Sequence, residues 1–232
     1  MKYLFWDIDG TLLLTNLAGV TALKSAIQEL YHVPDFTFSH SLAGRTDTFI
    51  ATQALREIKG GATAAEVNEL LDCYIKSLPT YLKQNHGHLL TNVAETLSFL
   101  QQRKDMLNLL LTGNCEAGAK AKLHHFGLDH YFDYSLSAFG EISELRDDLA
   151  KAAFQKIQKI NTNLDPQDII IIGDTPRDIT CAQAIGAKAL IVEDGSTYSR
   201  EELLSYHPWK IIPQLPACNK ELLAILEGEA LC

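Results

Sequence analysis

Two aspartates near the start of the chain, Asp7 and Asp9, have the types and spacing that could do chemistry. They follow an apolar run over residues 3–6, and side chains two apart on a strand point the same way. Gly10 then permits a sharp exit from the strand that a β-carbon would obstruct. Like charges held close need a cation or a shared proton, so the pair predicts a divalent metal site, a nucleophile beside a proton donor, or both. A solvated Asp-Gly-Thr turn is the alternative interpretation.

A second polar segment, Thr112 and Gly113, directly follows the apolar run 107–111. In α/β sheets, ligands bind beyond the carboxyl ends of the parallel strands. A hydroxyl and free backbone amides there are suitable donors to phosphate oxygens, so the segment predicts a phosphate-binding turn. A strand followed by an ordinary turn is the alternative.

A third segment begins with the isoleucine run 169–172 and continues through Gly173 to Asp174 and Asp178. Consecutive isoleucines favour a strand buried on both faces, which indicates a parallel sheet covered by helices. Carboxylate oxygens on the loop that follows are ligands that Mg²⁺ accepts. Asp178 could also serve as the N-cap of the next helix.

In this order and spacing the three segments resemble the haloacid dehalogenase (HAD) superfamily over nearly the whole chain. The stretch Leu-Ala-Gly-Arg-Thr-Asp at residues 42–47 resembles a loop in the helical cap of phosphoglycolate phosphatase-like members. The stretch Leu-Leu-Thr-Gly-Asn at residues 110–114 is similar to the same subgroup. The resemblance implies a Rossmann-like core, an inserted helical cap and Mg²⁺-dependent hydrolysis of a phosphate monoester.

The resemblance also implies a role for each acidic residue. Asp7 would be the nucleophile that forms a phosphoaspartate, and Asp9 the general acid and base. Mg²⁺ would be held by Asp7, a main-chain oxygen of Asp9, and Asp174. Asp178 would orient the metal site or the basic residue rather than bind the metal directly.

The phosphoryl group would be bound by Thr112, Gly113 and a basic residue between the second and third segments. The Lys-Pro pair that is usual in the family does not occur here. Arg146 is favoured because it lies just ahead of a predicted helix and its planar guanidinium grips phosphate bidentately. Lys151, further along that helix, is the alternative.

A cation in the cap, Arg45, is the candidate that recognises the leaving group. A mobile helical lid excludes bulk water in one step of such a reaction and admits one water in the next. Arg45 lies in a polar turn beside Gly44, where the resemblance places it facing the pocket. A surface arginine paired with Asp47 is the alternative interpretation.

The apolar periodicity divides the chain into an α/β part and a helical part. Strand signals alternate with helical patterns, which predicts a doubly wound parallel sheet with a last strand near residues 210–212 and a helix near 221–226. Apolar residues at helical spacing predict helices at 19–31, 47–58 and 64–82, and Thr63 with Glu66 forms a capping box. We therefore expect a core of residues 1–15 and 89–232 and an all-helical cap of residues 16–88. The earlier strands are expected at 2–7, 107–112, 131–136, 168–173 and 188–192.

Composition limits the partners and the compartment. A net charge of −9 on 232 residues argues against nucleic acid, whose binding needs clustered Lys and Arg. No apolar stretch approaches membrane-spanning length, and the N-terminus runs into the first strand without a signal peptide. The five cysteines are scattered, which is typical of reduced thiols in a cytoplasmic protein. We expect a small phosphorylated metabolite as the partner; the oligomeric state is left open.

The acid at position 9 separates the possible reactions. Dehalogenases of the superfamily lack it, because a halide leaves without a proton, so Asp9 implies phosphate-ester chemistry. Phosphosugar mutases share the aspartate pair and the helical cap, so a mutase is the alternative activity. A HAD-like fold that binds ligand without turnover is a third reading, and the sequence leaves the identity of the phosphate ester open.

Overall fold

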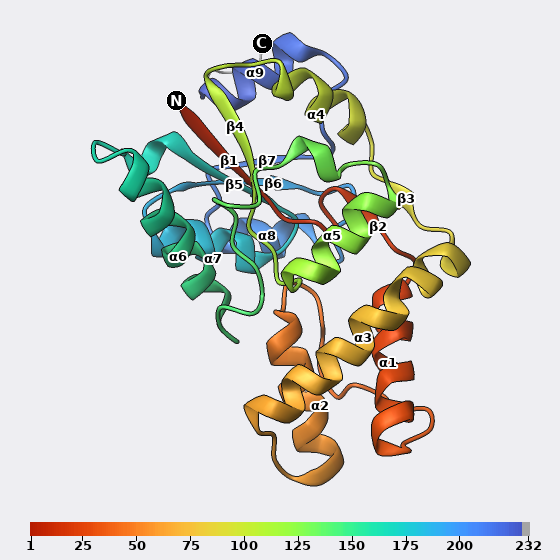
Figure 1. Cartoon of the computed structure of the whole chain (residues 1–232). Helices are drawn as coiled ribbons and strands as arrows, with labels where there is room; N and C mark the ends of the chain where they lie inside the picture. Colours follow the sequence, from red (N-terminus) through yellow and green to blue (C-terminus); the bar gives the residue numbers. More distant parts are fainter. Residues whose placement is uncertain (229–232) are drawn as a thin grey trace.

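A computed structural model describes residues 1–228, and Cys232 and the end of the predicted core lie outside them. A five-stranded parallel sheet forms the centre of the core, in the order β4-β1-β5-β6-β7 (Figure 1). Its strands are β1 (Lys2–Trp6), β4 (Met106–Leu110), β5 (Ile169–Gly173), β6 (Lys188–Val192) and β7 (Lys210–Ile212). The predicted α/β doubly wound class is confirmed.

The two faces of the sheet are covered by different helices, because neighbouring side chains of each strand point to opposite sides. In β1, Leu4 and Trp6 pack on one side and Tyr3 and Phe5 on the other. The first side is covered by α4 (Val93–Gln101), α5 (Glu116–His125) and α9 (Asn219–Glu227). The second side is covered by α6 (Arg146–Ile160), α7 (Pro176–Ala184) and α8 (Arg200–Ser205). Among residues 1–228 we find no helix with the length and hydropathy needed to cross a bilayer.

β1 lies between β4 and β5, so the strands that follow it in sequence lie on both sides of it. At such a switch point the loops beyond the carboxyl ends of neighbouring strands diverge and leave a crevice for a ligand. All three polar segments of the sequence therefore meet at one edge, beyond the ends of β1, β4 and β5.

Three helices between the first and second sheet strands in sequence form a separate layer on that edge (Figure 1). They are α1 (Ala18–Tyr31), α2 (Asp47–Lys59) and α3 (Ala64–Asn85), and they share an apolar core of their own. The predicted capping box at the start of α3 is confirmed, since Thr63 accepts from Glu66 N–H and the Glu66 carboxylate accepts from Thr63 N–H. The antiparallel strands β2 (Leu13–Leu14) and β3 (His88–Leu89) join this layer to the core.

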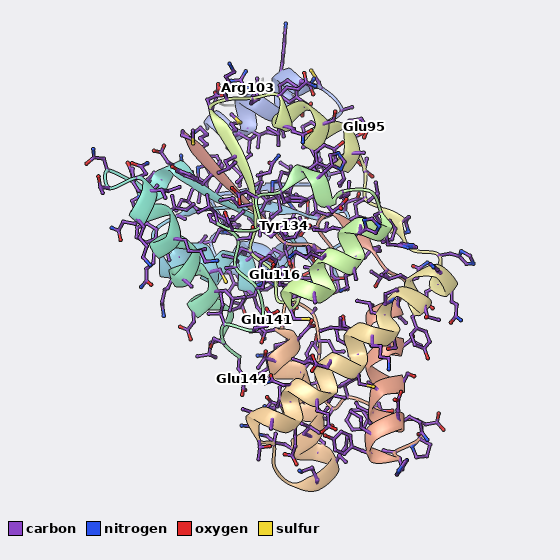
Figure 2. All side chains as sticks on the ribbon, in the orientation of Figure 1. Glu95, Arg103, Glu116, Tyr134, Glu141 and Glu144 are labelled. Carbon is purple, nitrogen blue, oxygen red and sulfur yellow. The ribbon has the colours of Figure 1, made fainter. Side chains whose placement is uncertain are left out.

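The start of α2 is held against the core by polar contacts. Asp47 N–H donates to the Gly113 carbonyl at 2.7 Å, and the Thr48 hydroxyl donates to the Gly140 carbonyl at 2.8 Å. In Figure 2, Glu116, Glu141 and Glu144 follow one another from α5 toward α2, along this junction. The helical layer is thus closed over the edge of the sheet.

The strand predicted at 131–136 is wrong. A short 3-10 helix, η1 (Asp129–Tyr131), is followed by a turn in which Asp133 Oδ1 accepts from Ser135 N–H at 2.9 Å. This local side-chain hydrogen bond competes with extended pairing. The segment therefore crosses the edge of β4, with Asp133 N–H and Ala138 N–H each bonded to a β4 carbonyl.

Candidate active site

Asp7 is the first residue after β1, and Arg146 is the first residue of α6. Asp7 N–H donates to the Ile172 carbonyl at 2.9 Å, which continues the pairing of β1 with β5 and fixes the direction of the carboxylate. Arg146 Nη2 lies 2.9 Å from Asp7 Oδ2, and the two side chains are only 4% and 5% exposed. The structure thus places Arg146 beside the predicted nucleophile.

Lys151, the alternative cation, lies elsewhere. Its side chain is 55% exposed, and its Nζ lies 3.1 Å from Asp148 Oδ1, one turn earlier on the same helix. A residue five positions after Arg146 points away from it, since a helix turns about 100° per residue. Of the two cations, Arg146 alone reaches the carboxyl ends of the strands.

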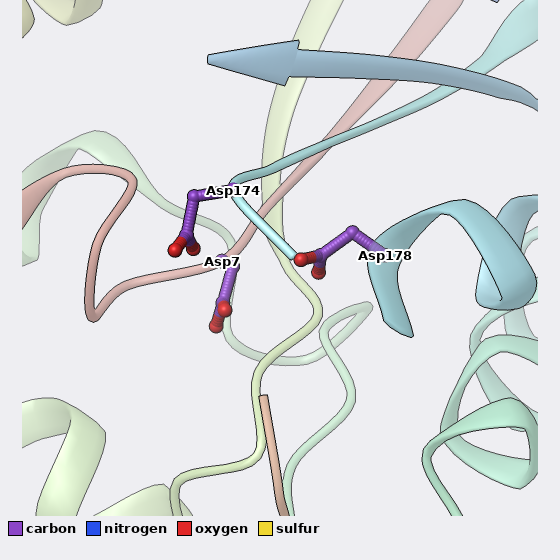
Figure 3. A group of neighbouring side chains, drawn as sticks. All are labelled: Asp7, Asp174 and Asp178. Atoms are coloured by element: carbon purple, nitrogen blue, oxygen red, sulfur yellow. The ribbon is translucent and has the colours of Figure 1, made fainter. Parts of the chain in front are cut away.

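Asp7, Asp174 and Asp178 form a buried acidic cluster, in which each offers an oxygen within 4.8 Å of the others (Figure 3). Both oxygens of Asp178 have protein partners. Oδ1 accepts from Arg146 Nη2 at 2.6 Å, and Oδ2 accepts from Thr175 N–H at 3.0 Å and the Thr175 hydroxyl at 2.8 Å. Thr175, not Asp178, is the N-cap of α7, and Asp178 completes a capping box with it. Asp178 therefore holds Arg146 and the loop in place.

Asp174 lies directly against the loop that follows β1. Its Oδ1 accepts from the Thr11 hydroxyl at 3.1 Å. A β-carbon on Gly10 would lie 2.4 Å from Asp174 Oδ2, and Gly10 has a φ of +85°. Glycine is required here both for its backbone conformation and for the close approach of the carboxylate.

Burial dominates the electrostatics of the cluster. It raises the pKa of Asp7 to about 6, against the opposing charge of Arg146, and raises the pKa of Asp174 well above its usual range. Burial lowers the pKa of Arg146, but Asp178 and Asp7 more than compensate and leave that pKa above its ordinary value. Of the three buried carboxylates, Asp7 and Asp178 pair with Arg146, and within the described residues Asp174 has no cation in contact, so the charge and the hard oxygen donors fit a divalent cation such as Mg²⁺.

Asp9, two residues after Asp7, accepts hydrogen bonds from two side chains: Asn114, in the loop after β4, and Lys122, on α5. Lys122 Nζ lies 2.6 Å and Asn114 Nδ2 2.8 Å from the same atom, Asp9 Oδ2. Lys122 Nζ also donates to Asn114 Oδ1 at 2.6 Å. Lys122 was absent from the sequence-based candidates, and the one available signal is its position on the apolar face of α5, next to buried Leu123.

The predicted phosphate-binding turn is divided between two environments. Gly113 and Asn114 line the cavity, whereas Thr112 is fully buried behind them. The Thr112 hydroxyl accepts from Asn114 Nδ2 at 2.9 Å and so helps to fix the amide that binds Asp9. A β-carbon on Gly113 would lie 2.1 Å from the Arg45 carbonyl, so glycine allows the cap loop to pack on this turn.

Arg45 lines the cavity from the cap side, and its guanidinium stacks on the Phe49 ring at 4.3 Å from the centroid. The Asp47 carboxylate accepts from Cys115 N–H at 2.9 Å, at the start of α5. Within the described chain no ion pair joins Arg45 to Asp47, and Arg45 Nε is buried without a hydrogen-bond partner. The guanidinium is thus placed to meet a ligand.

Most of the predicted site residues line a cavity of about 440 Å³ between the sheet edge and the helical layer, whereas Thr112 and Asp178 are fully buried behind its lining. Its core side carries the charged groups Asp7, Asp9, Lys122, Arg146 and Asp174, and Asp47 lines the cavity from the start of α2. Its cap side is mostly aliphatic, and Arg45 is the cation there. The aliphatic lining residues on the cap side are Leu17, Val20, Leu23, Leu42 and Ile50, and Leu14 of β2 also lines the cavity.

Solved structures with the same fold include three bacterial proteins. A predicted phosphatase from Clostridium acetobutylicum is 20% identical with a TM-score of 0.71, covering 97% of this chain and 98% of its own. A predicted phosphoglycolate phosphatase from Haemophilus somnus 129PT is 20% identical with a TM-score of 0.67, covering 98% and 97%. A protein from Bacteroides vulgatus proposed to be a β-phosphoglucomutase is 15% identical with a TM-score of 0.69, covering 98% and 89%. At these identities the likeness establishes the fold.

Sequence comparison establishes the family. No curated protein sequence gives a significant match to the chain. The family model described as haloacid dehalogenase-like hydrolase matches residues 4–192, which include all three polar segments and the helical layer. The chain therefore belongs to the haloacid dehalogenase-like hydrolase family.

Proposed function

We propose that the protein is a Mg²⁺-dependent phosphatase that hydrolyses a small-molecule phosphate monoester through a phosphoaspartate. The observation that carries the proposal is the buried Asp7 carboxylate, 2.9 Å from Arg146 and two residues from Asp9, at the floor of the cavity. A carboxylate held beside a phosphate-binding cation is placed to act as a nucleophile.

In the first step an Asp7 oxygen forms a bond to phosphorus while the bond from phosphorus to the leaving oxygen breaks. Asp9 gives a proton to that oxygen, which departs as an alcohol. In the second step Asp9 takes a proton from a water molecule, whose oxygen attacks phosphorus and releases Asp7. The Asp9 side chain is 43% exposed and lines the cavity, so it is accessible to the leaving oxygen in the first step and to the water molecule in the second.

The phosphoryl group is held by Arg146 and the Gly113 amide in this proposal, with the Thr112 hydroxyl as the further predicted ligand. Asp178 keeps Arg146 in place through the 2.6 Å contact. Asp7, the main-chain oxygen of Asp9, and Asp174 would hold Mg²⁺. Bound there, the ion would neutralise charge on the transferring group.

The helical layer is the proposed cap domain, residues 16–88, on a core of residues 1–15 and 89–232. Arg45 would recognise the leaving group, because it is the cation on the cap side of the cavity. We infer a small phosphorylated metabolite as the substrate and a cytoplasmic setting, in line with the acidic composition and scattered thiols.

A phosphosugar mutase of the same superfamily is the second candidate. It is favoured by the similar fold of the proposed β-phosphoglucomutase from Bacteroides vulgatus. A mutase would return the phosphoryl group of Asp7 to a sugar hydroxyl instead of to water.

Phosphate release from a panel of small phosphate esters tests the proposal, with and without Mg²⁺, for the wild type and Asp7→Asn. The panel covers phosphoglycolate, sugar phosphates, nucleoside monophosphates and phospholipid head-group precursors. Mg²⁺-dependent release that Asp7→Asn lacks would support the phosphatase. No release by the folded wild type would contradict it, and rescue by a sugar bisphosphate would then identify a mutase; ligand binding without any turnover would identify a binding module.

A further inference from the structure

Lys122 is a buried cation without an assigned role in the reaction described above. Its side chain is 5% exposed, although the other lysine of the same helix, Lys120, lies at the surface. A buried ammonium is costly unless its donors are satisfied. Here they are directed at Asp9 Oδ2 and Asn114 Oδ1, each at 2.6 Å.

The three side chains form a closed triangle. Asn114 donates through Nδ2 to the same Asp9 oxygen at 2.8 Å and accepts from Lys122 through its own oxygen. Asp9 Oδ2 therefore receives two donors, and the two carboxylate oxygens are no longer equivalent. The Asp9 side chain is 43% exposed to the cavity, so the carboxylate is anchored at one oxygen and open at its other side.

The cap closes over the ammonium. A β-carbon on Gly19 of α1 would lie 3.7 Å from Lys122 Nζ and 3.6 Å from the Tyr74 hydroxyl, so α1 and α3 pass directly above it. Exclusion of water strengthens the contact between the ammonium and the carboxylate. The helices α1 and α3 therefore shield the contact between Lys122 and Asp9 from solvent.

We propose that Lys122 is a positioning residue that, with Asn114, anchors Asp9 by Oδ2 and turns its other oxygen, Oδ1, toward the leaving oxygen of the substrate. The inference rests on the proposed function, because the proton transfer by Asp9 is part of it. Lys122 acts through Asp9 and moves no proton itself.

The test compares two kinds of ester for the wild type and Lys122→Met, which keeps the length of the side chain without its charge. The esters are p-nitrophenyl phosphate and the best alkyl phosphate of the panel. A nitrophenolate leaves without a proton, whereas an alkoxide needs one. Hydrolysis of the phosphoaspartate, in which Asp9 acts as base, is common to both esters and enters kcat but not kcat/KM. Since general acid catalysis contributes about 10²–10⁴-fold, we expect kcat/KM to fall about 100-fold for the alkyl ester and less than about threefold for the aryl ester.

Lys120→Met is the matched control. Lys120 lies on the same helix, is 53% exposed and pairs with Glu116 at 2.6 Å, so we expect neither rate to change. Lys122→Gln keeps a neutral donor and serves if Lys122→Met does not fold; it should show the same selective loss, in smaller measure. Equal loss on both esters, no loss on the alkyl ester, or a rise in KM alone would overturn the inference.

Turnover by the wild type tests the proposed phosphatase activity, and the ratio of wild-type to variant rates tests the role of Lys122, so the two can fail independently. A crystal structure of Lys122→Met tests the anchor without any turnover. An Asp9 carboxylate that has rotated away from Asn114 would support the inference. An unchanged Asp9 side chain would overturn it, whether or not the protein proves to be a phosphatase.

Discussion

Arg146 Nη2 and Asp7 Oδ2 lie 2.9 Å apart in an ion pair that is almost completely removed from solvent. Removing one partner of such a pair leaves an uncompensated buried charge, which costs about 3–5 kcal/mol. Arg146 is held from a second side by Asp178 at 2.6 Å, so the cation stays in place when Asp7 alone is neutralised. Neutralising Asp7 therefore removes a reacting group but leaves Arg146 paired, whereas removing Arg146 leaves both Asp7 and Asp178 without their cation.

Asp7→Asn is expected to abolish turnover, because an amide cannot form the phosphoaspartate. The expected loss is at least about 10³-fold, with the fold intact, since Arg146 keeps its contact with Asp178. Phosphate release and circular dichroism measure the two effects. Asp72→Asn, the same change at an exposed position of α3, is the control and should match the wild type. An active Asp7→Asn protein would end the proposed mechanism.

The stability of the metal-free protein should fall as the pH rises through the pKa of Asp7. Burial raises that pKa from 3.8 to about 6, so the folded protein holds this proton more tightly than the unfolded chain. The stabilisation from this tighter proton binding is fully present below pH 3.8, the pKa in the unfolded chain, and is lost as the pH rises through about 6, the pKa in the folded protein. A shift of one pKa unit corresponds to 1.36 kcal/mol, so the stabilisation amounts to about 3 kcal/mol.

Urea unfolding of the wild type and Asp7→Asn in chelator checks this sign. Because Asp7→Asn lacks the titrating group, it should gain stability relative to the wild type between about pH 4 and about pH 6. A constant difference between the two proteins over that range would contradict the raised pKa.

Arg146→Ala is expected to weaken the binding of inorganic phosphate far more than Lys151→Ala. A charge-assisted hydrogen bond contributes about 1.5–3 kcal/mol, which corresponds to a loss of about 10–100-fold in affinity. Lys151 is 55% exposed and pairs with Asp148, so its removal should change affinity less than about twofold. Inhibition constants for phosphate give the ranking, and thermal unfolding checks that each variant is folded. The reverse ranking would show that Arg146 is not the phosphate-binding cation.

Gly10→Ala is expected to weaken Mg²⁺ binding about tenfold or more, since the new β-carbon would displace Asp174 from a distance of 2.4 Å. Gly60→Ala is the matched control, because Gly60 also has a positive φ, +79°, but no atom lies within 4 Å of its β-carbon position. Backbone strain should cost each variant about 1–2 kcal/mol of stability, and Gly10→Ala should lose more because its β-carbon also meets Asp174. Only Gly10→Ala should shift the Mg²⁺ dependence of the thermal midpoint. An equal shift in both would contradict a metal site at Asp174.

The sequence by itself determined the fold class and the convergence of the main acidic groups. The carboxyl ends of parallel strands share one edge of a sheet, so Asp7, Gly113 and Asp174 had to meet once their strands were identified. The helical periodicity between residues 16 and 88 likewise predicted the three helices above that edge. These features follow from local patterns and a general rule of topology, and neither depends on the details of packing.

The tertiary structure decided which side chains reach that edge. Lys122 and Lys151 are both lysines on helices that cover the sheet, yet one is buried against Asp9 and the other is exposed. Similarly, Thr112 lies behind the turn that it was expected to present, and the segment 131–136 forms a turn where a strand was predicted. Burial and long-range pairing depend on how elements distant in sequence pack together, and a pattern of residue types along one segment does not encode that packing.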